Sequence, residues 1–359
     1  MRNVDSLRDW TTVAGGVLLA LGPVIAGCTR ESAPPAPAPA PPPFAGPALA
    51  RYEAMRIPAD NPMTAAKVEL GKQLYYDTRL SGDGQRSCYS CHVSEKGLTD
   101  GQPVAIGAFN RKLTRSSPTM WNIGYHSEWY WDGRAKTLEG QAKAAWSGGN
   151  MGASGKEGAP GMDAICATLN QVGDYKRMFQ EVFNEGCTQD NVPKALAAFM
   201  RTIVSTDSPW IRFRDGDTTA LSESARRGFQ VFDVKAQCSK CHSGLLLTDQ
   251  QYHNVGVGMT AKEPDLGRHN VTKEEKDRGA FKTPTLLDVS KSAPYFHNGS
   301  VATLEEAMDQ MLKGGIPNKW LDRTNLQPAK LTKAERTDLL QFLRELTVNY
   351  TITQPKPPQ

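Results

Sequence analysis

Two short cysteine–histidine units are the parts of this chain best suited to chemistry. Each unit places an imidazole directly after the second of two closely spaced thiols; the units are Cys88-Tyr-Ser-Cys91-His92 and Cys238-Ser-Lys-Cys241-His242. With this spacing both thiols can form thioether bonds to one porphyrin while the next imidazole reaches its iron from the same side. The sequence therefore predicts two covalently bound haem c groups, with His92 and His242 as iron ligands.

Two other kinds of site also use paired cysteines. A zinc half-site would bind the thiols without requiring a histidine at the next position. A redox disulfide would not be expected to recur about 150 residues later with the same histidine. Haem attachment therefore explains more of the pattern than either alternative does.

The first 50 residues have the composition of an export signal followed by a linker. An apolar stretch preceded by Arg2 and Arg8 ends in the letters IAGC, and residues 1–28 thus have the order of a signal peptide. The ending resembles a lipobox, in which Cys28 would carry a lipid; an ordinary signal peptide and a membrane anchor are the alternatives. Residues 29–50 are rich in Pro and Ala, which predicts a semi-rigid tether. We expect a periplasmic or extracytoplasmic body that contacts a membrane only through the N-terminal lipid.

Two further cysteines, Cys166 and Cys187, belong to neither haem unit. Disulfides form and persist in the oxidising compartments outside the cytoplasm. An exported chain would therefore join these two thiols in a disulfide, and a pair of free buried thiols is the alternative.

The composition is that of a globular protein of about two domains. Hydrophobic residues make up 39% of the 359 residues and charged residues 22%, and the net charge is +4. The chain has no basic run interleaved with aromatic residues, so we expect no nucleic-acid partner.

Apolar residues recur at helical spacing before each haem unit, in segments 65–77 and 222–233. A third amphipathic segment, 331–346, begins with Thr332 and Glu335 at the spacing of a capping box. Strand signals are few and short. The sequence therefore predicts a mostly α protein of two cytochrome-c-like domains, each carrying one covalent c-type haem.

The predicted organisation divides the chain after the export segment into three parts. Residues 51–205 would form an N-terminal peroxidatic domain, residues 206–350 a C-terminal electron-transfer domain, and residues 351–359 a tail. The roles of the two domains follow from a family resemblance.

Five motifs occur in an order that closely resembles the bacterial di-haem cytochrome c peroxidases. The motifs are Cys88–His92, RSSPTMWN, WDGRAKTLEGQA, Cys238–His242 and FKTPTLLDVSKSAPYFHNGSVATLEEAMDQM. The family also contains MauG, the methylamine-utilisation enzyme that oxidises residues of a protein. The resemblance covers about residues 51–350.

The resemblance implies different duties for the two haems. The haem held by His92 would bind peroxide, and the haem held by His242 would transfer electrons. A methionine 14 residues after the histidine of PYFH closes the second haem in the peroxidases, and this position is Met311 here. A thioether ligand raises the reduction potential. A core role on its helix is the alternative for Met311, with Met308 and Met259 as other candidate ligands.

The resemblance also implies roles for residues between the haem units. Trp131 falls on the tryptophan that lies between the two porphyrins, and Gln141 falls on a glutamine near the peroxide pocket. Ser116, Ser292 and Pro294 fall near a calcium site that bridges the domains. Two of these three positions are normally Asn and Thr in the peroxidases, so the sequence leaves calcium undecided.

Two departures from the family pattern concern the peroxide side. Ala108 stands where many members carry a histidine that blocks the resting iron, and His126 is the other nearby candidate but lies beyond the motif. We expect an open iron position at the first haem. Asn150 stands where the family has an acid–base glutamate, and an amide cannot take and return a proton at neutral pH. Either Glu157 reaches back to the site, or Gln141, Asn150 and water act alone; Glu157 as a solvated loop residue is the other interpretation.

These features predict a di-haem cytochrome c peroxidase that reduces H2O2 to water. Electrons would come from a small cytochrome c or cupredoxin, enter at the C-terminal haem and pass through Trp131 to the N-terminal haem. One rival function is MauG-like oxidation of Trp or Tyr residues in a partner protein. The other rival is a tethered di-haem electron carrier. Family members are often dimers, so a homodimer is an open alternative.

Overall fold

The computed structural model describes residues 55–350 and 352–359, and it is mostly helical with very little sheet. The predicted signal peptide, the lipid site at Cys28 and the tether all lie outside the described residues. Within the described ranges, no helix is both long enough and apolar enough to cross a membrane.

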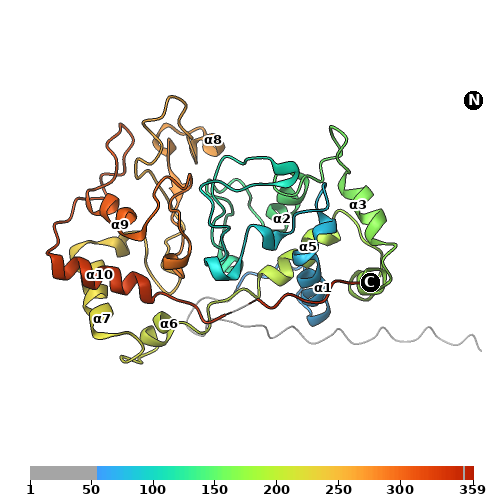
Figure 1. Ribbon diagram of the computed structural model, residues 1–359, viewed down its shortest axis with the longest axis horizontal. Coiled ribbons are helices and arrows are strands. Elements are labelled where there is room, and N and C mark those ends of the chain that lie inside the picture. The colour runs from blue at the N-terminus through green and yellow to red at the C-terminus, as the bar shows by residue number, and fades with distance from the viewer. Residues whose placement is uncertain (1–54, 351) are drawn as a thin grey trace, which may run out of the picture. The chain divides into compact units, whose positions relative to one another are not determined.

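Helices form in both halves of the sequence (Figure 1). The first half contains α1 (Ala65–Tyr76), α2 (Leu138–Ser147), α3 (Met162–Leu169), α4 (Gly173–Phe183) and α5 (Asn191–Met200). The second half contains α6 (Pro209–Arg214), α7 (Glu223–Gln230), α8 (His269–Thr272), α9 (Leu304–Leu312) and α10 (Lys333–Glu345). The three helices expected from the spacing of apolar residues are therefore confirmed, and α10 begins with the predicted capping box.

Short elements connect these helices. Strands β1 (Tyr252–His253) and β2 (Phe281–Lys282) pair antiparallel, with Tyr252 opposite Lys282. The 3₁₀ turns are Thr78–Leu80, Cys88–Ser90, Ser94–Lys96, Ala108–Asn110, Ile123–Tyr125, Cys238–Lys240, Glu275–Asp277 and Val289–Lys291, and a π turn spans Val231–Lys235. Much of the chain between α5 and α10 is irregular.

The two halves repeat one helix crossing. Helix α1 packs against α5, and α7 packs against α10. In the first pair, a Cβ atom on Gly71 would lie 1.9 Å from the carbonyl oxygen of Ala195; in the second, a Cβ on Gly228 would lie 2.0 Å from that of Asp338. Only a glycine permits such close approach of two backbones. The crossing thus positions the chain that leads into each haem unit, while the proposed domain boundary at residue 205 stays a prediction.

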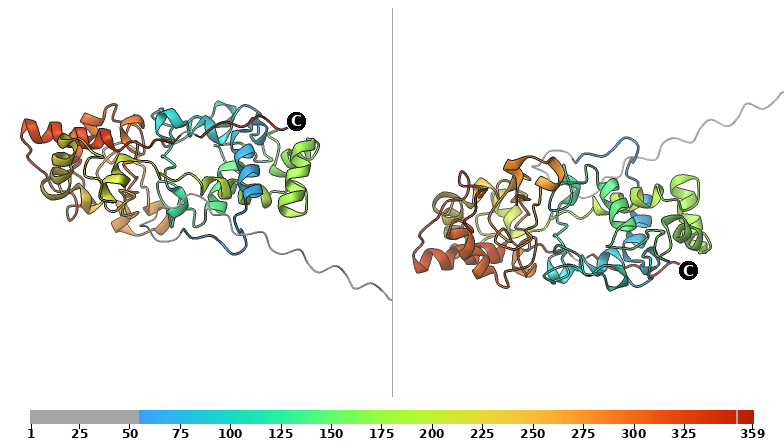
Figure 2. Two further views of the ribbon diagram at one scale, coloured as in Figure 1. Left: turned by 90° about the horizontal axis from the view of Figure 1, so that it is seen from below. Right: turned by 90° about the horizontal axis from the view of Figure 1, so that it is seen from above.

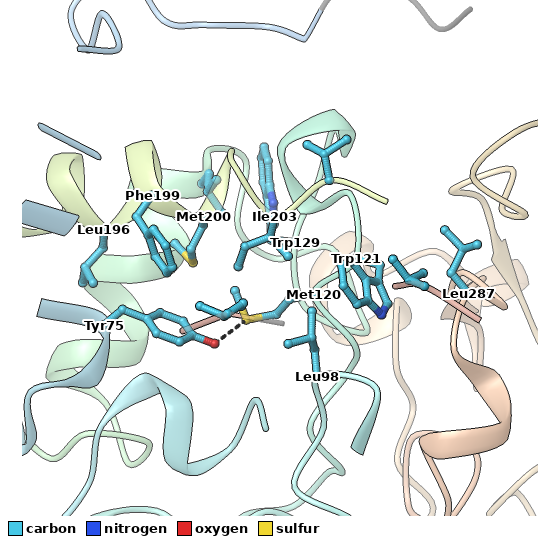
Figure 3. Close-up of a cluster of buried hydrophobic side chains, with 14 of the residues drawn as sticks. Tyr75, Leu98, Met120, Trp121, Trp129, Leu196, Phe199, Met200, Ile203 and Leu287 are labelled. Carbon is cyan, nitrogen blue, oxygen red and sulfur yellow. Dashed lines mark hydrogen bonds between the residues drawn. The ribbon is translucent and has the colours of Figure 1, made fainter. Parts of the chain in front are cut away.

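A continuous apolar core lies behind the first haem unit (Figure 3). The buried ring of Tyr75 packs edge-on against Phe199 of α5, and its hydroxyl donates to the sulfur of Met120 at 3.6 Å. Trp129 is 8% exposed and belongs to this core, where it acts as a packing residue.

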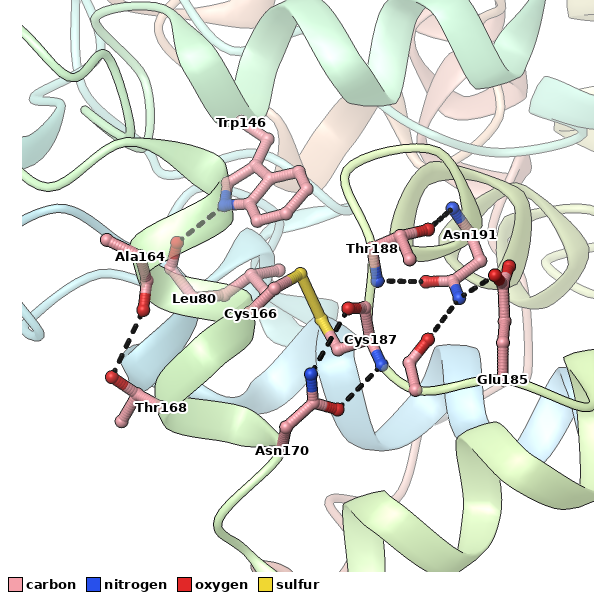
Figure 4. The surroundings of a disulfide bond; sticks show 11 residues. Leu80, Trp146, Ala164, Cys166, Thr168, Asn170, Glu185, Cys187, Thr188 and Asn191 are labelled. Carbon is pink, nitrogen blue, oxygen red and sulfur yellow. Dashed lines mark hydrogen bonds between the residues drawn. A yellow bond between two sulfur atoms is a disulfide. The ribbon is translucent and has the colours of Figure 1, made fainter.

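The predicted disulfide between Cys166 and Cys187 is present (Figure 4). It ties α3 to the loop before α5, and Asn170 brackets Cys187 by accepting from its N–H at 2.7 Å and donating to its carbonyl at 3.3 Å. Closing a loop of 21 residues stabilises a fold by on the order of 3 kcal/mol. The bond secures the outer edge of the first half.

One buried carboxylate, that of Asp288, joins the two halves. It accepts from the indole N–H of Trp121 at 3.0 Å and from the backbone N–H of Val348 at 3.0 Å, and Lys291 lies 2.9 Å away. Asp288 and Trp121 are each 1% exposed. The contact therefore fixes the first half against the segment that follows α10.

The end of the chain returns to the first half, beside α1 (Figures 1 and 2). Tyr76 donates its hydroxyl proton to the carbonyl of Ile352 at 2.8 Å, and Arg79 donates to that of Pro358 at 3.1 Å. The backbones of Asp174 and Gln359 also meet, because the N–H of Asp174 donates to the carbonyl of Gln359. The predicted tail is thus packed against the body.

Asp288→Ala should lower the free energy of unfolding by about 3 kcal/mol, because it leaves buried N–H groups of Trp121 and Val348 without an acceptor. Denaturant unfolding followed by far-UV circular dichroism would measure this change. Asp207→Ala is the matched control, since that carboxylate is 56% exposed and pairs with Arg212. Equal stability losses in the two variants would contradict a special role for Asp288.

Candidate active site

Both haem units present their histidine in the same way. His92 follows the turn Cys88–Ser90, and its Nδ1 lies 3.0 Å from the carbonyl oxygen of Leu98. His242 follows the turn Cys238–Lys240, and its Nδ1 lies 3.0 Å from the carbonyl oxygen of Leu247. A carbonyl accepts only, so each Nδ1 must carry the proton and each Nε2 is left with a lone pair for a metal. Burial also lowers the pKa of both imidazoles, which favours this neutral form.

The four thiols of the units are free and partly buried. Burial raises the pKa of Cys88 to about 12 and that of Cys91 to about 11, and it raises the pKa of Cys238 to about 12. A neutral sulfur suits this partly buried position, and the sulfur of a thioether bond to haem is neutral.

A cavity adjoins the second unit and fits a haem. Its wall includes Cys238, Cys241 and His242, together with Met311 of α9. Apolar side chains form most of the remainder; they include Phe232, Val255, Leu286, Leu304, Leu339 and Leu343. No Asp or Glu lines the cavity among the described residues. A porphyrin needs two thiols, one imidazole and a dry apolar surround, and the chain supplies all of them here.

The structure separates the three methionine candidates. Met311 and Met308 both line this cavity, as expected if either closes the second haem. Met259 is not part of the cavity wall, and its sulfur lies against Gly279 instead. Met259 is therefore poorly placed as an iron ligand, and the choice between the other two stays a prediction.

Trp131 lies in the wall of the same cavity, although it comes from the first half of the chain. Its indole N–H donates to the carbonyl of Ser116 at 3.0 Å, and its own carbonyl accepts from the backbone N–H of Lys282 at 2.8 Å. The next residue, Asp132, is buried and pairs with Arg115 at 2.7 Å and with Arg134 at 3.0 Å. Contacts to both halves thus hold the Trp131 ring in place.

The segment that binds the Trp131 indole also borders the first haem unit. Ser117 and Pro118 line the cavity of His242. They also contact the first unit, because Ser117 hydrogen-bonds to the Cys91 thiol and the carbonyl of Pro118 to the His92 ring. The two haem units therefore share one stretch of backbone as a common wall.

The two positions that depart from the family pattern lie side by side. The N–H of Ala108 donates to the carbonyl of Asn150 at 3.0 Å. Ala108 is 1% exposed, and a Cβ on Gly152 would approach its methyl group to 2.8 Å. The structure therefore brings together the missing histidine and the missing glutamate, in a segment that has no room for a larger side chain.

The other predicted acid–base residues are not assembled around this point. Gln141 lies on α2, and only its backbone carbonyl is engaged by a side chain, the hydroxyl of Tyr130 at 3.3 Å. Glu157 is exposed, adopts a positive φ of 53°, and has no hydrogen bond or ion pair with the described residues. The exposed side chain favours the solvated interpretation of Glu157.

The predicted calcium positions lie together in the wall of the cavity: Ser116, Ser292 and Pro294. The hydroxyl of Ser116 donates to the carbonyl of Phe296 at 2.9 Å, and that of Ser292 donates to the carbonyl of Val289 at 3.1 Å. Both hydroxyls are thus engaged within the protein. Calcium at this place stays a prediction.

One charged cluster beside the second unit was not anticipated. The imidazole of His253 lies between two carboxylates, with Nε2 2.9 Å from Asp249 and Nδ1 2.6 Å from Asp322. The hydrogen bond to Asp249 is the largest cause that raises the pKa of His253 to about 11. Asp249 also donates its N–H to the carbonyl of Cys241 at 2.7 Å, so the cluster braces the haem-attachment turn. No motif marks it, because Asp322 is far from the other two in sequence.

Comparisons with known proteins identify the family of this chain. The model of a family described as di-haem cytochrome c peroxidase matches residues 65–219. Cytochrome-c peroxidase IdrP1 of Denitromonas iodatirespirans is 35% identical, with 95% of each chain covered. Methylamine utilization protein MauG of Methylorubrum extorquens is 36% identical, with 86% of each chain covered. The crystal structure of a MauG-like protein associated with microbial copper homeostasis superposes with a TM-score of 0.75 at 30% identity, over 89% of this chain and 97% of that one.

The diheme peroxidase BthA of Burkholderia thailandensis shares the fold, with a TM-score of 0.67 at 18% identity over 80% of this chain and 87% of that one. The family is established by the two relatives that are 35% and 36% identical over most of both chains. The chain belongs to the di-haem cytochrome c peroxidase family and is an oxidoreductase of the cytochrome-c peroxidase class.

Proposed function

We propose that this protein reduces H2O2 to water with electrons from a small redox protein. Each turnover consumes one H2O2, two electrons and two protons and yields two waters. The observation that carries the proposal is the position of Trp131, which lines the His242 cavity and donates to Ser116 of the wall shared with the His92 unit. Electrons would enter at the C-terminal haem and pass through Trp131 to the N-terminal haem.

The haems, when bound, supply the one-electron chemistry, and the protein residues hold and orient the haems. Cys88, Cys91 and His92 would hold the peroxidatic haem, and Cys238, Cys241 and His242, with Met311 as a further ligand, would hold the electron-transfer haem. The indole of Trp131 has a low ionisation energy compared with an aliphatic side chain, which suits it as a relay. The methyl group of Ala108 offers no donor atom to an iron, so peroxide can approach the first haem.

Proton transfer is the less usual part of the proposed mechanism. Asn150 and Gln141 can orient peroxide by hydrogen bonds but cannot exchange a proton with it at neutral pH. Glu157 is the acidic candidate on the same loop, and its exposed position argues for water as the proton carrier instead. We therefore expect turnover slower than in relatives that keep the glutamate.

The proposal extends to the setting of the enzyme. A lipid on Cys28 and the 29–50 tether would hold the body outside the cytoplasm, with cytochrome-c-like domains at 51–205 and 206–350. The donor would be a small cytochrome c or a cupredoxin. Calcium between the domains and a homodimer are further options that the family resemblance leaves open.

MauG-like oxidation of a partner protein is the second candidate. Ala108 and Asn150 favour it, since an open iron without an acid–base glutamate would reduce peroxide less readily. Met311 argues against it, because MauG has a tyrosine in that place. A tethered electron carrier is the weakest rival, because a carrier gains nothing from an open iron position.

The resting ferric protein should show one high-spin haem, five-coordinate or water-bound, beside one low-spin haem. The physical reason is that Ala108 cannot ligate iron whereas a methionine can close the second haem. Electron paramagnetic resonance of the purified protein would detect both signals, and a spectrum with low-spin signals alone would contradict the open site. Met311→Ala should convert the low-spin signal to high-spin, and Met308→Ala is the matched control.

Mixing the reduced protein with H2O2 in a stopped-flow instrument should sort the three functions. With reduced cytochrome c present, we expect rapid and repeated oxidation of that cytochrome, because electrons refill both haems. A long-lived spectral change without turnover would favour protein oxidation instead. The absence of any reaction would leave the electron carrier as the function.

Trp131→Phe should slow electron transfer between the haems at least tenfold while leaving both haem spectra nearly intact. A phenyl ring is much harder to oxidise than an indole, although it fills similar space. Flash or stopped-flow reduction of the second haem, followed at the first, would give the rate. Trp129→Phe is the matched control, because Trp129 lies in the core, and an equal effect in both variants would contradict the relay.

A further inference from the structure

A buried lysine lies at the edge of the second cavity and has no carboxylate partner. Lys282, on β2, is 8% exposed and lines the cavity next to Phe281. Its ammonium donates to the backbone carbonyl of Glu128 at 2.6 Å and to Nδ1 of His126 at 3.2 Å. No third partner occurs among the described residues, so one ammonium N–H is unused.

The histidine beside it also has an unused N–H. Because Nδ1 of His126 accepts from an ammonium, the ring proton must sit on Nε2. This Nε2 is buried and has no hydrogen-bond partner among the described residues. Burial, with a smaller effect from the nearby Lys282 charge, lowers the pKa of His126 well below its usual range, so the ring is neutral. Buried donors are nearly always satisfied, and this pair therefore lacks an acceptor.

The missing acceptor is of an identifiable chemical class. Lys282 is the one Lys or Arg in the cavity wall, and no Asp or Glu lies there, within the described part of the chain. Haem c carries two propionate carboxylates, and a buried carboxylate needs a cation and N–H donors around it. Lys282 supplies the cation in the cavity wall, and His126, which lies behind it and outside that wall, orients its ammonium.

We propose that Lys282, oriented by His126, is the counter-cation of the C-terminal cavity and binds a carboxylate of the haem held there. The inference rests on the proposed function only in that a haem must occupy this cavity. Lys282 also donates its backbone N–H to the carbonyl of Trp131 at 2.8 Å. The same residue would thus bind the haem carboxylate through its side chain and Trp131 through its backbone.

The neighbouring charges leave this role to Lys282. The carboxylate of Glu128 is engaged elsewhere, by Lys136, Tyr252 and Arg268. Burial opposes its ionisation, but these hydrogen bonds lower the pKa of Glu128 to about 2. Tyr252, the cross-strand neighbour of Lys282, has a pKa raised by burial and stays neutral. Two histidines also line the cavity: the hydrogen bond to Asp249 raises the pKa of His253 to about 11, and burial lowers the pKa of His297 to about 4. Lys282 is thus the group in the wall whose charge can change near neutral pH.

A cation near an iron favours the reduced state, because reduction adds a negative charge. Burial lowers the pKa of Lys282 to about 8, and a bound carboxylate would act in the opposite direction. As the pH rises through that pKa, the ammonium loses its charge and the reduction potential of the second haem should fall. A neutral side chain at this position should give the low potential at every pH.

The test is the reduction potential of the second haem in Lys282→Met and Lys282→Arg, measured by spectroelectrochemistry between pH 6 and about 10. At a fixed potential and neutral pH, Lys282→Met should lower the ratio of reduced to oxidised haem at least tenfold, about 59 mV for a one-electron couple. It should also lose the alkaline fall in potential. Lys282→Arg should keep the neutral-pH value, and Lys136→Met, which removes an exposed lysine nearby, should behave as the natural protein.

Every other result also bears on the inference or on the proposed function. If the ratio of reduced to oxidised second haem in Lys282→Met stays within threefold of the natural protein, the counter-cation role is overturned. Loss of the second haem in both Lys282 variants but not in Lys136→Met would mean a structural role and also overturn it. Loss in Lys282→Met alone, with Lys282→Arg loaded, would support it. A natural protein without two haems in the pyridine haemochrome assay would instead refute the proposed function.

Discussion

The placement of the two haem units depends on a carboxylate that touches neither of them. Asp288 accepts from Trp121 of the first half and from the backbone after α10, with both side chains withdrawn from water. A buried acceptor of this kind is directional, since its N–H donors lose much of their hydrogen-bond energy if they shift. A relay residue between two cofactors needs such a fixed register, because electron transfer is sensitive to small changes in separation. The lysine near Asp288 neutralises its charge without entering the junction.

The shared wall of residues 116–118 lies along the proposed path of electrons between the two haems. Trp131 donates to Ser116, while Ser117 and Pro118 face the thiol and imidazole of the first unit. The proposed route would therefore cross a few hydrogen bonds of one backbone segment and would not require a long chain of aromatic rings. The cavity beyond it has mostly apolar walls and no Asp or Glu among the described residues, so a charge placed there is less screened than it would be in water.

Local chemistry explains which parts of the site the sequence predicted. A C-x-x-C-H unit can be recognised because all of its residues lie within five consecutive positions. In both units the histidine Nδ1 binds a backbone carbonyl in the same way. The helices at 65–76 and 333–345 also follow from spacing and capping. The disulfide followed from the compartment and from two spare thiols. Met311, Trp131 and Gln141 came from resemblance, and the structure places the first two in one cavity and leaves the third outside that cavity's wall.

The features that the sequence did not predict join residues far apart along the chain. His253 and Asp322 are separated by 69 positions, and Lys282 and His126 by 156. Neither pair has a spacing rule, because their contact is made by tertiary packing alone. The packing of the tail was not predicted either, because Tyr76 of α1 and the nearby Arg79 bind it through backbone carbonyls that no side-chain pattern reveals.

The repeated glycine crossing has a consequence for how such an enzyme divides its labour. Gly71 and Gly228 give the two halves the same helical frame, and the frame presents the same thiols and the same imidazole tautomer on both sides. The frame therefore does not distinguish the two haems. In the proposed function the difference would come from what covers each free face: the α9 methionine at the second haem, and the loop of Ala108 at the first. In this arrangement, the segment that covers the free face of a haem would set its reactivity. Such a segment can change in sequence while the helices that hold the haem stay the same.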